Sequence, residues 1–264
     1  MPLNIPGLLV PFQLLIYPRL VVPALVVKDI RQIDFCALKR AGYRGAVFDK
    51  DNCLTLPHRD TIVPELQKSW EICRETFGED NVLIVSNSAG TKLDAGGIQS
   101  ESVTHHLKVP VLRHKAYKPA YSCIAGIRRY FSSLRSPILD HELIIVGDRV
   151  FTDVVIANRM RMHSDRQRQN LLTSSASSQD PEKELPLEAS KTEIPVGPLA
   201  IWTTGVWQRE SMFIRWIEHG LVNAVEKWST PPTGEPIDVS RFLKEEKIEP
   251  PKKSSSLFSS LRRT

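Results

Sequence analysis

Short apolar runs alternate with stretches of helical periodicity from about residue 30 onward. Four of the apolar runs predict buried strands: 44–49, 81–87, 109–114 and 143–148. Three amphipathic stretches between them predict helices: 63–78, 91–107, which two glycines weaken, and 119–134. Strands that alternate with helices pair in parallel and place helices on both faces of the sheet. The pattern therefore predicts an α/β fold built on a doubly wound parallel sheet.

A last apolar unit follows at 197–228. Its second part carries apolar side chains at helical spacing, namely Phe213, Ile214, Trp216, Ile217, Leu221 and Val225. We expect these side chains to lie in the core. Contact of some of them with a membrane is the alternative.

The first 29 residues form a separate apolar segment, in which Arg19 is the only charge between residues 3 and 27. Length and apolarity alone would suit a membrane span, but any continuous helix is interrupted by four prolines, Pro6, Pro11, Pro18 and Pro23. The segment also lacks the basic start and cleavage site of a secretory signal. We expect an arm that either packs on the domain or lies shallowly in a lipid interface.

Amino-acid composition sets the boundaries of the remaining segments of the chain. Residues 164–195 are rich in Ser, Glu, Gln, Lys and Pro and have no apolar period, so we expect a disordered insertion. This leaves an arm at 1–29, a folded domain at 30–228 and a flexible basic tail at 229–264. The tail is expected to be solvated. An anionic lipid surface is the alternative, bound by Lys252, Lys253, Arg262 and Arg263 beside Leu257 and Phe258.

Composition and charge narrow the classes of function. With 264 residues and 41% hydrophobic content, the chain can bury a sizeable core. The formal charge of +5 is spread along the chain and favours anionic partners only weakly. Zinc-finger and RNA-recognition signatures are absent from the sequence, so we predict no nucleic-acid partner, and protein partners stay unknown. The four cysteines stand far apart and suit a reducing compartment.

Polar side chains follow the predicted strands, at the sheet edge where doubly wound folds bind ligands. In chain order they are Asp49 and Asp51, Ser86 and Asn87, Lys118, and Asp148 and Asp153. Carboxylates that converge at one edge repel each other unless a cation neutralises them, and Mg²⁺ takes oxygen ligands together with phosphate and water. The sequence therefore predicts a magnesium site with room for a phosphate, and its candidate ligands are Asp49, Asp51, Asp148 and Asp153.

The same groups suit phosphoryl transfer. Asp49 stands first after its strand, where it can act as a nucleophile and form an aspartyl-phosphate. Asp51 lies two residues further on the same side of an extended chain, so it can protonate the leaving group and later deprotonate water. The phosphate is expected to be bound by Ser86, Asn87 and Lys118. For Asp153, capping of the following helix is the alternative role.

The order of these groups resembles the four motifs of the haloacid dehalogenase-like phosphohydrolase superfamily. The motifs are DKDNC at 49–53, VSNS at 85–88, KP at 118–119 and GDRVFTD at 147–153. Five longer blocks look like the mitochondrial phosphatidylglycerophosphatase family within it: FDKDNCLTLP, LIVSNSAG, VLRHKAYKP, VGDRVFTDVVIANRM and IWTTGVWQRES. The likeness covers roughly residues 15–220. It implies a haloacid dehalogenase-like core, and the short spacing between Asp51 and Ser86 leaves no room for a large cap domain.

The resemblance also implies a specific function. It points to a magnesium-dependent phosphatase that converts phosphatidylglycerophosphate to phosphatidylglycerol in cardiolipin biosynthesis, through an aspartyl-phosphate intermediate. The substrate would be a phospholipid at a membrane surface, and the protein would lie peripherally on the matrix side of the mitochondrial inner membrane. Two features depart from the family pattern. Cys53 stands where the wider superfamily usually has threonine or valine, and the insertion at 164–195 looks specific to this chain.

Two other functions stay open: a phosphatase of a soluble phosphomonoester, and a non-catalytic membrane-associated scaffold. A scaffold has no need for a cluster of like charges, which argues against that function. A receiver-type phosphoacceptor domain is disfavoured, because its phosphorylated aspartate follows the third strand, where this chain has RHKAYKP. Cys53 is expected to be a packed neighbour, since no nearby base would activate its thiol. Candidate contacts for a lipid phosphate are Arg113, His114, Lys115 and Arg149.

Overall fold

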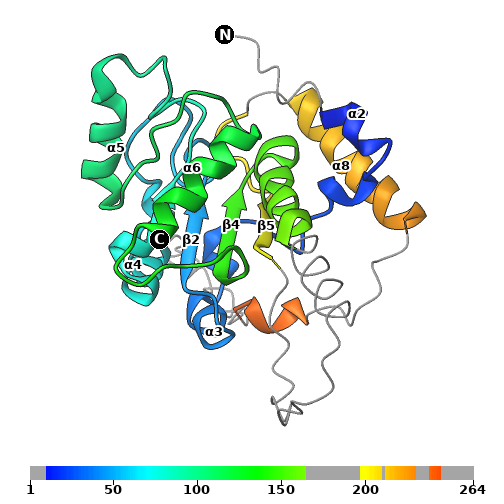
Figure 1. Ribbon diagram of the computed structural model, residues 1–264, viewed down its shortest axis with the longest axis horizontal. Helices are drawn as coiled ribbons and strands as arrows, with labels where there is room; N and C mark the ends of the chain where they lie inside the picture. Colours follow the sequence, from blue (N-terminus) through cyan, green and yellow to red (C-terminus); the bar gives the residue numbers. More distant parts are fainter. Residues whose placement is uncertain (1–9, 165–196, 210–211, 230–237, 245–264) are drawn as a thin grey trace, which may run out of the picture.

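A computed structural model describes residues 10–164, 197–209, 212–229 and 238–244. At the centre of these residues is a five-stranded sheet with the order β1-β5-β4-β2-β3, in which every neighbouring pair runs parallel (Figure 1). The strands are β1 (Leu25–Val27), β2 (Gly45–Phe48), β3 (Val82–Ile84), β4 (Leu143–Gly147) and β5 (Leu199–Thr203).

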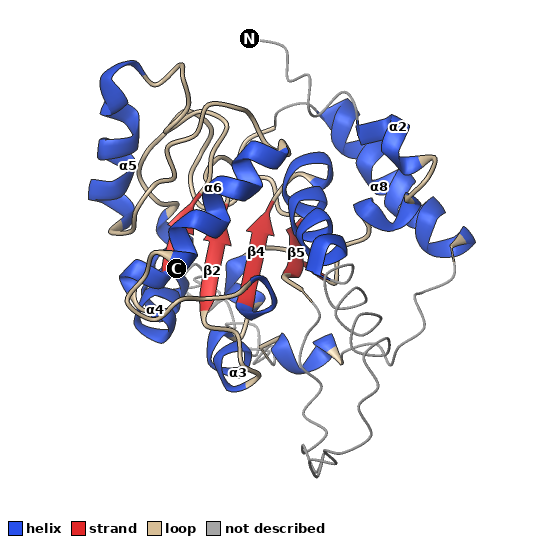
Figure 2. Cartoon of the chain, viewed as in Figure 1, coloured by secondary structure: helices blue, strands red, loops and turns tan. Residues whose placement is uncertain are grey.

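Helices cover both faces of the sheet (Figure 2). They are α2 (Val10–Leu14), α3 (Phe35–Arg40), α4 (Gln67–Phe77), α5 (Ile98–Leu107), α6 (Tyr121–Ser132) and α8 (Met212–Trp228), and the π-helix η7 (Val150–Val154) continues as an α-helix over 155–164. Single 3-10 turns link them: η1 (Pro18–Val21), η2 (Ile30–Gln32), η3 (Pro64–Leu66), η4 (Glu79–Asn81), η5 (Ala95–Gly97), η6 (Asp140–Glu142) and η8 (Val239–Phe242). The predicted doubly wound α/β fold, with no large cap between β2 and β3, is confirmed.

The core consists of two apolar layers, one on each face of the sheet. Alternate residues of β2 point to opposite faces, so that Phe48 belongs to the apolar layer that includes α3, α4 and α5, whereas Val47 belongs to the layer that includes α6, the helix 155–164 and α8. Trp70 of α4 packs edge-on against Phe48 and donates its indole N–H to the Leu107 carbonyl at 2.9 Å. The strands are thus buried on both faces, as parallel strands require.

Three of the four predicted strands form, and the fourth is much shorter than expected. Within 109–114 only Val111 pairs with the sheet, opposite Ile84 at the end of β3. Pro110 has no N–H to donate, so the pairing depends on its carbonyl, which accepts from Ile84, and on the Leu112 N–H. The rest of this segment is a loop beside β3, and it places His114 near the polar edge of the sheet.

The three predicted helices form, with different starting points. The turn at Pro64 leads into α4, and Gly78, with a φ of 93°, ends it as expected. The helix predicted over 91–107 begins only at residue 98, because Gly96 and Gly97 both adopt positive φ. The helix predicted over 119–134 is α6.

The prediction that the apolar residues of α8 lie in the core is wrong for most of them. Val225 is buried and Leu221 is partly buried, but four of the predicted core residues are exposed: Phe213, Ile214, Trp216 and Ile217. The inward face of α8 instead carries Arg215, Glu218, Val222 and Val225. The physical reason lies beneath the helix, where the carboxylate of Asp148 is buried and needs a cation.

Both ends of the described chain pack on the folded domain. Residues 25–27, which belong to the predicted arm, pair with β5, and Leu20 and Val21 just before them are buried. Within the predicted tail, Phe242 is buried edge-on against Tyr43. The predicted insertion lies outside the described residues except for Ser164, as do the basic residues 252–263. Among the helices that can be described, none combines the length and apolarity needed to cross a bilayer.

Candidate active site

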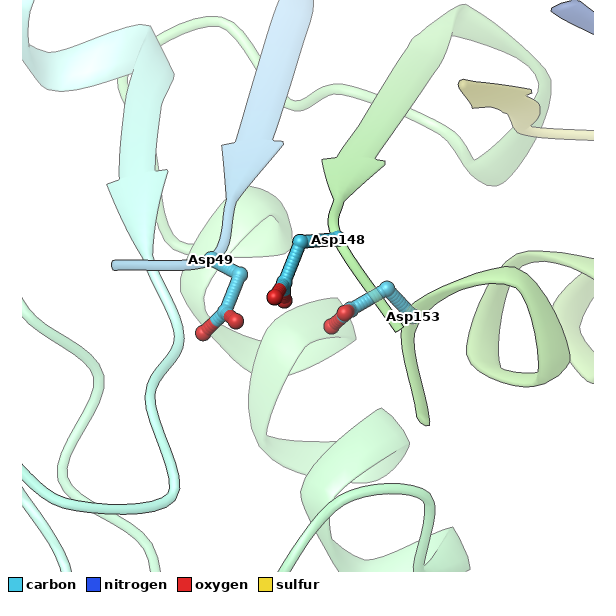
Figure 3. A group of neighbouring side chains, drawn as sticks. All are labelled: Asp49, Asp148 and Asp153. Atoms are coloured by element: carbon cyan, nitrogen blue, oxygen red, sulfur yellow. The ribbon is translucent and has the colours of Figure 1, made fainter. Parts of the chain in front are cut away.

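Three aspartates meet at the carboxyl edge of the sheet (Figure 3). Asp49 follows β2 directly, Asp148 follows β4, and Asp153 projects from η7. A carboxylate oxygen of each lies within 4.8 Å of the others, and the three residues are only 9%, 2% and 3% exposed. Neighbouring parallel strands end side by side, so the order of the sheet brings together residues about 100 positions apart.

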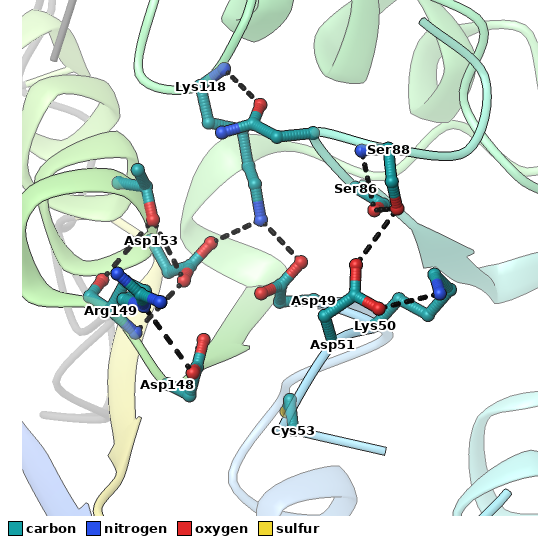
Figure 4. A network of polar contacts seen from close by, with 12 residues as sticks. Asp49, Lys50, Asp51, Cys53, Ser86, Ser88, Lys118, Asp148, Arg149 and Asp153 are labelled. Carbon is teal, nitrogen blue, oxygen red and sulfur yellow. Dashed lines mark hydrogen bonds and ion pairs between the residues drawn. The ribbon is translucent and has the colours of Figure 1, made fainter. Parts of the chain in front are cut away.

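Lys118 joins two of these carboxylates. Its Nζ donates to Asp49 Oδ1 and to Asp153 Oδ1, each at 2.7 Å (Figure 4). Burial alone would lower the pKa of Lys118, but the carboxylates of Asp153 and Asp49 outweigh that effect and raise it. The ammonium therefore stays charged in a site from which water is largely excluded.

The acidic group carries more negative charge than Lys118 can balance. Burial, together with the charges of Asp49 and Asp153, raises the pKa of Asp148, and burial also raises that of Asp153. One oxygen of Asp148 is bound by Arg215, whereas its Oδ1 is buried without a protein hydrogen-bond partner. An orphaned carboxylate oxygen facing two further carboxylates fits a hard divalent cation, so the cluster is compatible with a bound metal.

Gly147 explains how two of these aspartates can share the edge. A Cβ at position 147 would collide with the Asp153 carboxyl group, so glycine at the end of β4 makes room for it. The Asp153 side chain also accepts from the Arg149 N–H at 3.3 Å and the Thr152 hydroxyl at 3.1 Å. The Asp153 carboxylate thus faces the acidic cluster and Lys118. A residue that only capped the following helix would not need the contact with Lys118.

Asp51 lies beside the cluster but outside the group of three. Its carboxylate accepts from Lys50 Nζ at 2.7 Å, the Ser88 hydroxyl at 2.9 Å and the His58 N–H at 3.1 Å. These three donors hold the side chain in one orientation, and Figure 4 shows the contacts with Lys50 and Ser88. Its role as a metal ligand stays a prediction.

Ser86 and Asn87 lie on the loop after β3, next to Asp51 and Lys118. The Ser86 hydroxyl is buried and lies 2.8 Å from that of Ser88, whose N–H also donates to it. Asn87 accepts the backbone N–H of Lys118 at 2.7 Å and so fixes the start of the Lys118 side chain. Beneath them, His114 places one ring nitrogen 2.9 Å from the Ser86 carbonyl oxygen.

Four functional neighbours were not predicted from the sequence: Lys50, Ser88, Arg215 and Glu218. Lys50 is fully buried and Ser88 orients Asp51, and both stand within the DKDNC and VSNS motifs, which could have indicated them. Arg215 reaches Asp148 from α8, 67 positions away. The only signal for Arg215 and Glu218 was the presence of two oppositely charged residues at i and i+3 inside a very apolar stretch of helical spacing.

Cys53 and the cationic side chains near the motifs occupy different settings. Cys53 is buried, as expected of a packed neighbour, and burial raises the pKa of its thiol well above the usual value. Arg149 lies 3.7 Å from Asp148 at the rim of the cluster. The other three, Arg113, His114 and Lys115, line a separate hollow of about 290 Å³ beside the loop at 90–100.

The model of the mitochondrial PGP phosphatase family matches residues 5–164, and this range contains all seven predicted site residues. The chain belongs to this family. Within it, the chain is 40% identical over 159 residues to phosphatidylglycerophosphate phosphatase 1 of Arabidopsis thaliana, named as chloroplastic and mitochondrial. It is 36% identical over 158 residues to the mitochondrial phosphatidylglycerophosphatase of Saccharomyces cerevisiae.

The matched part covers 60% of this chain in both comparisons, but 44% of the Arabidopsis member of the family and 83% of the yeast member. A third family member, from Chlamydomonas reinhardtii, is 42% identical over 144 residues, which is 51% of its length. The chain therefore spans about half the length of the two photosynthetic relatives. No solved structure matches the chain.

Proposed function

We propose that this protein is a magnesium-dependent phosphatase that removes the terminal phosphate of phosphatidylglycerophosphate and releases phosphatidylglycerol for cardiolipin synthesis. One observation carries the proposal: three buried carboxylates, Asp49, Asp148 and Asp153, share one sheet edge with the ammonium of Lys118. Such a cluster suits a site for a metal and a phosphate. The names of the relatives supply the substrate.

The metal would be held by Asp49, Asp148 and Asp153, and the orphaned Oδ1 of Asp148 supports this assignment. When bound, Mg²⁺ would neutralise the carboxylates and the phosphate oxygens, so that an anionic nucleophile can approach an anionic substrate. Asp51, held by Lys50 and Ser88, would stay available for proton transfer.

In the first step, a carboxylate oxygen of Asp49 would attack the terminal phosphorus. The bond between phosphorus and the glycerol oxygen breaks, and Asp51 would give that oxygen its proton. The negative charge on the three other phosphoryl oxygens would be stabilised by Lys118 and by donors of the loop at Ser86 and Asn87. Lys118 lies in hydrogen-bond contact with Asp49, which suits this role.

In the second step, Asp51 would take a proton from a water molecule that attacks the same phosphorus. The bond between phosphorus and Asp49 breaks, inorganic phosphate leaves, and both carboxylates return to their starting forms. The three donors that orient Asp51 support a fixed position for both proton transfers.

The proposed location is the matrix side of the mitochondrial inner membrane, with peripheral attachment. The mitochondrial names of the relatives support the organelle. The substrate is an amphiphile, so its head group has to be reached at a bilayer surface.

The test is phosphate release from phosphatidylglycerophosphate in mixed micelles with Mg²⁺. Asp49→Asn keeps the shape of the side chain but removes the nucleophile, so we expect its rate to fall by about 10³-fold or more. Asp140→Asn is the matched control, because Asp140 pairs with Arg128 away from the acidic cluster.

Three results would contradict parts of the proposal. Equal rates for wild type and Asp49→Asn would remove Asp49 from the mechanism. Turnover of a soluble phosphomonoester but not of the lipid would make the lipid assignment wrong. Inactivity on both substrates would favour the non-catalytic scaffold.

A further inference from the structure

The outer sides of α2, of the turn that follows it at 15–17, and of α8 form one exposed apolar surface. The two elements lie side by side in Figure 1, and Arg19 of η1 donates to the carbonyl and hydroxyl of Ser229 at the end of α8. We call this the α2–α8 surface, and its exposed residues are Phe12, Leu15, Ile16, Tyr17, Met212, Phe213, Ile214, Trp216, Ile217 and Trp228. Exposed apolar groups of this density mark an interaction site.

The orientation of α8 is the reverse of that in an ordinary surface helix. Two of its charged residues, Arg215 and Glu218, are buried, and its other two, Glu226 and Lys227, are exposed near its C-terminal end, whereas Trp216 is 73% and Phe213 71% exposed. A soluble helix turns its apolar stripe toward the core and its charges toward water. Water therefore disfavours this face of α8, and contact with an apolar phase would stabilise it.

Both elements of the surface are fixed to the candidate active site. From α8, Arg215 donates to the carboxylate and to the carbonyl oxygen of Asp148. From α2, Gln13 accepts from Arg159, whose guanidinium also donates to the carbonyl of Pro119, the residue after Lys118. The surface thus has a set orientation relative to the carboxyl edge of the sheet. Whatever covers the surface therefore has a set position relative to that edge.

The chemistry of the surface selects among possible partners. Five of its ten side chains are aromatic, namely Phe12, Tyr17, Phe213, Trp216 and Trp228, and aromatic residues favour the boundary between lipid tails and head groups. The first acidic residue of the chain is Asp29, so α2 and η1 bring no negative charge, and Arg209 precedes α8 as an exposed cation. The surface is thus apolar and aromatic, has no acidic group on α2 or η1, and has the cation of Arg209 beside α8. These properties are complementary to anionic phospholipids.

We propose that the α2–α8 surface lies in the interface of an anionic phospholipid bilayer and turns the carboxyl edge of the sheet toward the lipid head groups. This inference rests on the proposed function in one respect, since a lipid substrate explains why the surface is fixed to the site. The contact itself is independent of catalysis, and it can be measured without turnover.

The experiment measures binding of the full chain to vesicles by co-sedimentation. The vesicles contain equal parts of phosphatidylcholine and phosphatidylglycerol, with phosphatidylcholine alone for comparison. The variants are Phe213→Ser with Trp216→Ser on α8, and separately Phe12→Ser on α2 with Ile16→Ser in the turn after it. Each pair is expected to lower the partition coefficient at least about tenfold, because two large apolar side chains no longer enter the lipid.

The matched control is Ile98→Ser with Leu139→Ser. These side chains are similarly exposed, at 73% and 60%, but lie outside the α2–α8 surface. The control is expected to bind vesicles as the wild type does. All three double variants should hydrolyse a soluble phosphomonoester at the wild-type rate, which shows that they are folded. Asp49→Asn should bind vesicles normally, so loss of activity and loss of binding are separate results.

Several outcomes would overturn the proposal. One is a wild type that does not bind the mixed vesicles. Another is a loss of binding in the control as large as that in the two surface variants. If the surface substitutions instead convert an oligomer to a monomer in gel filtration, with vesicle binding unchanged, the surface is an interface between copies of the chain. If vesicles bind as expected but the lipid is not hydrolysed, the docking stands and the proposed function fails.

Discussion

Arg215 and Glu218 are charged side chains in a setting that usually excludes charge. Both are buried on the inner side of α8. Arg215 is bound to Asp148, and the pairing compensates two desolvated charges at once. Glu218 accepts only the N–H of Phe151 at 3.2 Å, and its Oε2 has no partner among the described residues. Burial therefore raises the pKa of Glu218.

This raised pKa predicts a stabilising substitution. Below the ordinary carboxyl pKa of 4.5, Glu218 is protonated in both the folded and the unfolded state. As pH rises past that value the unfolded state ionises first, so the free energy of unfolding falls until the folded-state pKa is passed. We expect Glu218→Gln to raise the melting temperature at pH 7.5 by about 2–4 °C, the effect of about 1 kcal/mol in a domain of this size.

The gain from Glu218→Gln should shrink as pH is lowered toward 4.5, and thermal denaturation followed by circular dichroism checks both points. Glu226→Gln is the control, because Glu226 is exposed on the same helix. A gain that does not depend on pH would show that the unpaired charge is not its cause.

Single residues also mark the limit of what the sequence could predict at the site. Asp49, Asp148 and Lys118 could be placed because each follows an apolar run, and parallel strands end at a common edge. Arg215 could not, because its contact with Asp148 depends on how α8 packs across the sheet. The two residues stand 67 positions apart, so no short sequence motif contains both of them.

Among the elements, the segment of α2 and η1 is joined to the rest of the domain by side-chain hydrogen bonds and not by strand pairing. Asn158, in the helix 155–164, donates to the carbonyls of Leu20 and Val22, each at 2.9 Å. Both carbonyls belong to a segment without a sheet partner of its own before β1. A buried amide thus holds the N-terminal segment on the domain.

Removing this amide should loosen one element and leave the others intact. Asn158→Ala deprives two carbonyls of a donor, so we expect a loss of about 1–3 kcal/mol in the free energy of unfolding. Hydrogen exchange followed by mass spectrometry should become faster in residues 10–22 but not in β2 or β4. Asn223→Ala, at an exposed position of α8, is the control. Unchanged exchange in residues 10–22 would mean that other contacts hold the segment.

The predictability of the elements followed their sequence context. β2, β3 and β4 were predicted because each is a buried run between helical stretches. β1 was not, since three residues inside a proline-rich apolar arm give no distinct strand signal. α8 was predicted as a helix, but the prediction placed the wrong side of it in the core. Periodicity alone cannot show that the buried carboxylate of Asp148 binds Arg215 and so turns the charged side of the helix inward.

At the scale of the whole molecule, the acidic cluster opposes folding when no cation is bound. Three carboxylates converge there, balanced in the described part of the chain by Lys118 and Arg215 and, more weakly, by the partly exposed Arg149 at the rim. A ligand that binds only the folded state stabilises it by mass action. The stability of the protein should therefore depend on divalent metal.

We expect Mg²⁺ at about 100 times its dissociation constant to stabilise the protein by about 2.7 kcal/mol, and excess EDTA to reverse the effect. Differential scanning calorimetry measures it. Asp148→Asn should lose most of the response, whereas Asp140→Asn should keep it. Acidification should weaken the response, because burial raises the pKa of Asp148 and protons then compete with the metal. A full response in Asp148→Asn would place the metal elsewhere.

The pairing of β1 with β5 has a consequence for how the chain reaches its native state. Leu25 lies opposite Ile201, so β1 is synthesised long before the strand with which it pairs. The family match ends at residue 164, before β5 and α8. Until both have been synthesised, β4 keeps an open edge and Asp148 lacks its guanidinium partner. Such distant contacts slow folding, and until α8 is made the unfinished chain exposes apolar surface that favours aggregation.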